Sequence, residues 1–219
     1  MADQVSICNQ ALGWLGANLI TSLDDDNREA QLCKTNFPDL RNAVLEEREW
    51  TFAVRRFQVA PLVLETLYGY TNQFLIPPIV IRVLNFPNTQ FTDPGSSLLI
   101  GTGLGVRAVG PDQQPQLNTF RVEGLEEPGA TGNIILANTD NLIFRAIVVV
   151  ANIGLWSPMF IQCMAARIAA DLAIPLTQNR NLQRDMWTLY RDKLTRASVM
   201  DGIQGKMEIK RNEALQRVR

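Results

Sequence analysis

The feature that most constrains the fold is a change in hydrophobic periodicity along the chain. Near both ends, apolar residues recur every three or four positions, the spacing that gathers side chains on one helical face. Between residues 57 and 150 this pattern gives way to β-branched runs separated by Pro, Gly and Asn, which is typical of strands and turns. The sequence therefore predicts an α+β fold, in which N- and C-terminal helices form a helical bundle with a β-rich, sandwich- or barrel-like insertion between them.

The same change in pattern sets the expected domain organisation. Residues 1–56 and 151–200 are expected to form one discontinuous helical bundle domain, and residues 57–150 the β-rich insertion domain. From Asp201 onward the apolar period fades, so residues 201–219 are expected to form a C-terminal arm. A chain of 219 residues is long enough to bury a sizeable core around such an insertion.

Two helices are expected before the insertion, at about residues 2–15 and 27–49. Asp26 followed by Glu29 has the form of a capping box, and the run of aspartates there lacks the ligand spacing of a calcium loop. Pro38 predicts a kink or a short break in the second helix. The expected inward positions are Val5, Cys8, Ala11, Leu12, Leu15, Ala30, Cys33, Phe37, Leu40 and Val44.

Two further helices are expected after the insertion. Ser157 is the expected N-cap of the first, with Pro158 at the first helical position and Pro175 at the end. Its alanines form a small-residue surface that lets another helix approach closely. The last helix is expected at about residues 179–200, with Gly202 as its stop. Its expected inward residues are Leu182, Met186, Leu189, Leu194 and Ala197.

Within the insertion, β-branched runs bounded by turn residues predict the strands. The last two are joined by residues 138–141, a polar segment that favours a hairpin loop. The expected strands are residues 73–76, 79–84, 97–100, 106–109, 118–122, 133–137 and 142–150.

The chain contains no histidine, which excludes Ser-His-Asp and Cys-His catalysis and the usual imidazole zinc sites. Carboxylate, lysine or tyrosine chemistry remains open. The three cysteines, Cys8, Cys33 and Cys163, are far apart within apolar helical patterns, and so are expected to be buried free thiols in a reducing compartment. The sequence therefore predicts no catalytic residue, no cofactor-binding residue and no metal site.

One segment bears on membrane insertion, because no charged residue lies between Arg145 and Arg167, a length that spans a bilayer. Asn152, Ser157-Pro158 and Gln162 interrupt it. We interpret it as a buried strand, a turn and a buried helix, so no membrane span is expected. The polar, acidic N-terminus also lacks the pattern of a secretory signal.

The tail after Asp201 carries five basic residues against three acidic ones, counting Asp201 itself. Two interpretations stay open: a frayed terminus, or an arm that becomes ordered on a partner. The candidate partner-contact residues of this arm are Lys206, Lys210, Arg211, Arg217 and Arg219.

Four stretches, taken in order, carry a resemblance to a known family. The chain opens with ALGWLGANLITSLDDDNREAQLC and a helix ending in REWTFA, and then continues with IPPIVIRVLNF, FRVEG…GNIILAN and SPMFIQCMAARIAADLAIPLTQNRNLQRDMWTLYRDKLTRA. This ordered set resembles the tail tubular protein A family, the head-to-tail adaptor proteins of short-tailed, T7-like bacteriophages. The resemblance covers most of the chain and is weakest at residues 85–117 and after Asp201.

The resemblance implies a structural virion protein in the neck of the viral tail, assembled in the host bacterial cytoplasm. Such proteins form a homododecameric ring that docks under the portal protein and receives the tail nozzle, tail tubular protein B. Genomic DNA passes through the channel during ejection without specific binding, which agrees with a formal net charge of −1. The tail after Asp201 is then a candidate arm for the portal.

Two alternatives remain at this point. The first is a virion-associated glycan hydrolase, which needs two carboxyl groups about 5–9 Å apart in a cleft. The second is a DNA-binding module acting through the basic tail, which predicts steeply salt-dependent binding. The carboxylates available to a hydrolase are Glu46, Glu47, Glu49, Glu123, Glu126 and Glu127.

Overall fold

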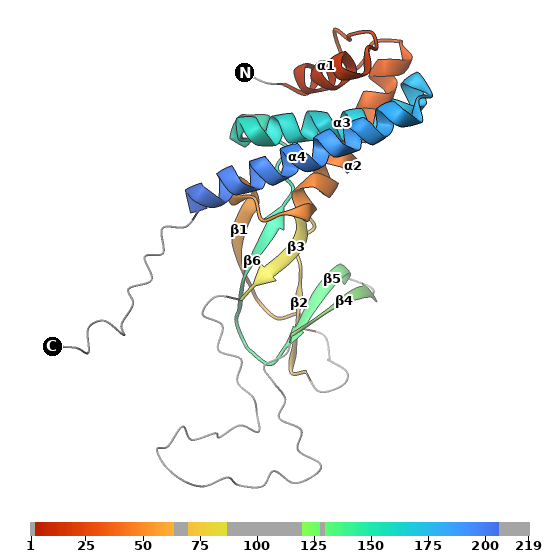
Figure 1. The fold of residues 1–219 in the computed structure, drawn as a ribbon. Coiled ribbons are helices and arrows are strands. Elements are labelled where there is room, and N and C mark those ends of the chain that lie inside the picture. Colours follow the sequence, from red (N-terminus) through yellow and green to blue (C-terminus); the bar gives the residue numbers. More distant parts are fainter. Residues whose placement is uncertain (1–2, 64–69, 87–119, 128–129, 206–219) are drawn as a thin grey trace, which may run out of the picture. The chain divides into compact units, whose positions relative to one another are not determined.

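The structure, a computed structural model, describes residues 3–63, 70–86, 120–127 and 130–205 (Figure 1). The chain divides into two compact units. Residues 1–54 and 148–219 belong to the first, the helical unit, and residues 55–147 to the second, the β unit. The fold class is the α+β arrangement that the sequence predicts, with N- and C-terminal helices around a β-rich region.

The helical unit is built around α3, on which the other three long helices pack. Five alanines of α3 are fully buried, and their small side chains let the neighbouring helices approach closely. An aromatic cluster lies at its start, where Phe160 makes edge-on ring contacts with Trp50 and Trp156. The elements are α1 (Gln4–Leu15), α2 (Arg28–Glu47), η1 (Thr51–Ala53), η2 (Ile153–Leu155), α3 (Pro158–Thr177) and α4 (Arg180–Gly205).

Short polar side chains cap the helices α1, α2 and α3. The cap of α2 differs from the one that the sequence predicts. Ser157 caps α3 by accepting a hydrogen bond from the Phe160 N–H, as predicted. The cap of α2 is Asn27, whose side chain accepts from the Ala30 N–H, so the prediction of Asp26 was wrong by one position. The described capping box is instead in α1, between Asp3 and Ser6.

Three residues expected to break or end helices lie inside them. α2 is continuous through Pro38, so the expected short break is absent there. Pro175 lies in the last turn of α3, which ends at Thr177 and is followed by Gln178 in the left-handed conformation, with a φ of 53°. Gly202 lies within α4, and a Cβ there would meet only open space. Packing of each helix against the unit outweighs the cost of the single unfavourable residue.

The β unit contains two three-stranded sheets, in the orders β1-β6-β3 and β2-β5-β4. Side chains of both sheets, among them Phe74, Ile135 and Phe144, fill one shared core, which makes the insertion sandwich-like. The strands are β1 (Val54–Val59), β2 (Asn72–Leu75), β3 (Val80–Asn85), β4 (Arg121–Glu127), β5 (Ala130–Ala137) and β6 (Leu142–Val148). The expected strands at 97–100 and 106–109, and residues 118–119, lie outside the described residues.

The segment 138–141 is not a hairpin loop, because β5 and β6 belong to different sheets. It crosses from one sheet to the other and is tied to the start of β2. The Asn138 side chain accepts from the Thr71 N–H, and the Asn72 amide donates to the Thr139 carbonyl. β5 pairs antiparallel with β2 along its last four residues, so its edge is already occupied where a hairpin partner would lie.

Candidate interaction surface on helix α4

The C-terminal end of α4 has two contrasting faces. Leu194, Ala197 and Asp201 are buried against the helical unit. On the other side Val199, Met200 and Ile203, here called the α4 apolar patch, are 57%, 56% and 69% exposed. Large apolar side chains grouped on one exposed helix face are typical of a surface that a partner covers.

Asp201 fixes this end of the helix to the unit. Its carboxylate accepts hydrogen bonds from the Thr51 N–H at 2.7 Å and from the Thr51 hydroxyl at 2.8 Å. Asp201 is 4% exposed, and a buried carboxylate is stable only when its oxygens are hydrogen-bonded in this way. The α4 apolar patch therefore rests on an anchored helix rather than on a frayed end.

A second polar cluster joins α2, α3 and α4 around Arg167. Its guanidinium contacts the Asp171 carboxylate at 2.8 Å and the Glu47 carboxylate at 3.4 Å. The same group lies 4.6 Å above the Trp187 ring and 5.3 Å from that of Tyr190. The Glu47 carboxylate and the two rings therefore connect α2 and α4 to Arg167 of α3, which is a packing role, while the Asp171 pair lies within α3.

The Tyr190 hydroxyl is buried in this cluster and has no hydrogen-bond partner among the described residues. Burial, followed by the nearby Glu47 carboxylate, raises the pKa of Tyr190 above its ordinary value. Burial likewise raises the pKa of the neighbouring Cys163 thiol to about 12. Neither group is poised to give up a proton near neutral pH.

The described acidic side chains do not gather into a metal site. Glu46 lies at the end of α2, Glu49 follows the helix, and Glu123, Glu126 and Glu127 lie on β4, all exposed. Glu47, the last residue of α2, pairs with Arg167. In the described part of the chain, no group of three or more Cys, Asp or Glu side chains is arranged to hold a metal ion.

The acidic loop before α2 satisfies its own charges. Asp25 accepts from the Thr21 and Ser22 N–H groups, and Asp24 pairs with Lys34. Hydrogen bonds from the Ser22 and then the Thr21 backbone lower the pKa of Asp25. These local bonds explain the aspartate run as a structured loop.

The five candidate arm residues, Lys206, Lys210, Arg211, Arg217 and Arg219, lie outside the described residues. The expected start of the arm at residue 201 was wrong, because α4 continues to Gly205. The sequence does contain a pattern that indicates that the helix continues past residue 200. Tyr190, Leu194, Ala197 and Asp201 follow the four-three-four spacing of one helix face, with an aspartate in place of the last apolar residue.

One described helix, α3, is long and apolar enough to cross a membrane by length and composition. Within that stretch 56% of the residues are buried in the structure, and the core helix of a soluble protein meets the same criteria. Comparisons of the chain with protein-family models and with curated proteins find no match.

Proposed function

We propose that this protein is a head-to-tail adaptor, a structural virion protein whose homododecameric ring joins the portal protein to the tail nozzle of a short-tailed bacteriophage. The ordered sequence resemblance to the tail tubular protein A family supports this proposal. The single structural observation that supports it most is the α4 apolar patch on an anchored helix, next in sequence to the candidate arm. We propose no enzymatic activity, no cofactor and no membrane span.

In this proposal the portal covers the α4 apolar patch. Each apolar side chain of this size contributes about 1.5–3 kcal/mol when it is fully buried, so the patch supplies affinity without charge. The basic residues of the arm, from Lys206 to Arg219, supply long-range attraction to acidic groups on the portal. Asp201 anchors the helix that carries the α4 apolar patch.

The remaining partners follow from the same role. The nozzle protein binds the opposite side of the ring, and genomic DNA passes through the channel. A chain with a formal net charge of −1 has no strong general attraction for phosphates, which suits a conduit that must release DNA. The structure offers no observation that favours either alternative, the glycan hydrolase or the DNA-binding module.

The proposal is tested by measuring portal binding of three variants by light scattering. Val199→Ser with Met200→Gln and Ile203→Asn removes the patch, and a chain ending at Gly205 removes the arm. Both are expected to weaken binding at least tenfold, equivalent to about 1.4 kcal/mol. A matched control, Leu19→Ser with Leu155→Ser, changes side chains that are 63% and 50% exposed on the same unit and is expected to bind normally.

Circular dichroism of each variant separates lost binding from lost folding. Normal portal binding by both the patch variant and the shortened chain would overturn this assignment of the contact. Salt-dependent binding of duplex DNA that disappears in the shortened chain would favour the DNA-binding alternative instead.

A further inference from the structure

Two charged rows lie on two different helices of the helical unit. On α4, Arg184 and Arg191 are exposed and seven positions apart, so they lie on one flank of the helix. On α2, Asp39 and Glu46 are exposed and also seven positions apart. Seven residues of helix span about 10 Å, so the two rows have the same spacing.

Neither row is neutralised by an ion pair among the described residues, since none of the ion pairs there includes one of these four side chains. The nearest opposing charges on α4, Asp185 and Asp192, lie roughly a quarter turn around the helix from the arginines, on another face.

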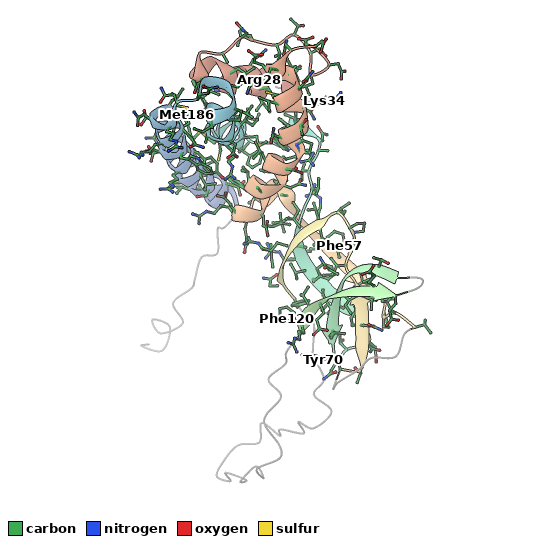
Figure 2. The ribbon with its side chains drawn as sticks, turned by 90° about the vertical axis from the view of Figure 1, so that its right-hand side faces the viewer. Arg28, Lys34, Phe57, Tyr70, Phe120 and Met186 are labelled. Atoms are coloured by element: carbon green, nitrogen blue, oxygen red, sulfur yellow. The ribbon has the colours of Figure 1, made fainter. Side chains whose placement is uncertain are left out.

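The rows do not pair with each other within one copy, because no ion pair joins the described residues of α2 to those of α4. The main packing partner of both helices is α3. Figure 2 labels Lys34 on α2 and Met186 on α4, the two helices that carry the rows. A second copy of the chain can bring its α2 row to the α4 row of the first.

We propose that the α4 row of one copy binds the α2 row of the next. The contact joins two different surfaces, so it is head-to-tail, and repeating it produces a ring or a filament rather than a closed dimer. Exposed ion pairs contribute only about 0.2–1 kcal/mol each, so the rows set the register and choice of partner more than the affinity. This inference rests on the proposed ring and names the surfaces that join its subunits.

Cysteine cross-linking of the full chain tests the contact directly. Two double variants are needed, because α2 of one copy can run parallel or antiparallel to α4 of the next. Asp39→Cys with Arg184→Cys tests the parallel arrangement, and Asp39→Cys with Arg191→Cys tests the antiparallel one. A short bismaleimide is added at high protein concentration. The native chain is the control, because Cys8, Cys33 and Cys163 are buried.

The expected result is a ladder of dimers, trimers and larger species from at least one double variant. Each single variant alone gives no dimer, and a mixture of the two matching single variants stops at the dimer. Adding Glu46→Lys to the productive double variant is expected to reduce cross-linking about tenfold, since one pair becomes repulsive. Each double variant keeps one of the two α4 arginines, which faces position 46 of the next copy. Changing that arginine to Glu as well makes the pair attractive again and is expected to restore cross-linking.

The absence of a ladder from both double variants, or dimers from a single variant alone, would overturn the inference. The outcome is separable from that of the proposed function. A chain that binds portal but gives no ladder is an adaptor with a different subunit contact. A chain that gives a ladder but ignores portal has this contact without the adaptor role.

Discussion

Asp201 is the residue whose role in the fold is most sharply defined. We expect Asp201→Asn to lower the free energy of unfolding by about 1–3 kcal/mol, since the Thr51 N–H and hydroxyl lose a charged acceptor. Urea unfolding followed by circular dichroism measures the change. Asp192→Asn, an exposed aspartate on the same helix, is the matched control and should alter stability by less than about 0.5 kcal/mol. Equal effects of the two substitutions would show that Asp201 does not anchor α4.

The raised pKa of Tyr190 predicts how the stability of the protein changes at alkaline pH. Its pKa is raised in the folded protein, so its contribution to stability is complete below the unfolded pKa of about 10 and is lost as pH rises toward the folded value. We expect Tyr190→Phe to be neutral or stabilising by up to about 1 kcal/mol at pH 7, because it removes a buried hydroxyl without a partner.

The same variant should lose less stability than the native chain above pH 10. Unfolding in urea of the native chain and of the variant, at pH 7 and at pH 10.5, measures both effects. A loss of more than about 2 kcal/mol at pH 7 would indicate that the hydroxyl has a partner after all.

Single residues were predictable from sequence where one local bond determines them. Ser157 was identified as a cap because its hydroxyl needs only the nearby Phe160 N–H. The cap of α2 was missed by one position because Asp26 and Asn27 are both good caps, and only the backbone geometry distinguishes them. The anchoring role of Asp201 was missed because its partner, Thr51, lies 150 residues away in the sequence.

At the scale of elements, the alanine face of α3 determines how closely the helices approach. Ala169 is fully buried, and we expect Ala169→Leu to lower the free energy of unfolding by about 1–3 kcal/mol through overpacking. Thermal and urea unfolding measure this loss. Ala151→Leu, at an exposed position before η2, should be neutral. If both variants have native stability, α3 is not the closely packed centre of the unit.

The helices were more predictable than the strands for a physical reason. A helix shows its apolar face in one stretch of sequence, whereas strand pairing joins segments far apart. β1 was missed because Arg55-Arg56 makes its pattern polar, although Phe57 packs on the β-unit core. The supposed hairpin at 138–141 was a reasonable inference from local turn residues, but β5 is already paired with β2 and β4.

At the scale of the whole molecule, the change in periodicity predicted the α+β fold, because patterning reports which surface each segment must bury. The candidate arm could not be checked in this way, since its residues lie outside the described part of the chain. The α4 apolar patch was missed because an amphipathic pattern does not distinguish apolar residues that face the core from those left for a partner.

The mass of the purified chain in solution, alone and with its cognate portal protein, tests the adaptor proposal most directly. Light scattering measures the mass without a label. We expect a complex of ring size with the portal, whether the chain alone is a monomer or already a ring. A chain that stays separate from the portal at every concentration examined would contradict the proposal and return the glycan hydrolase and DNA-binding alternatives to consideration.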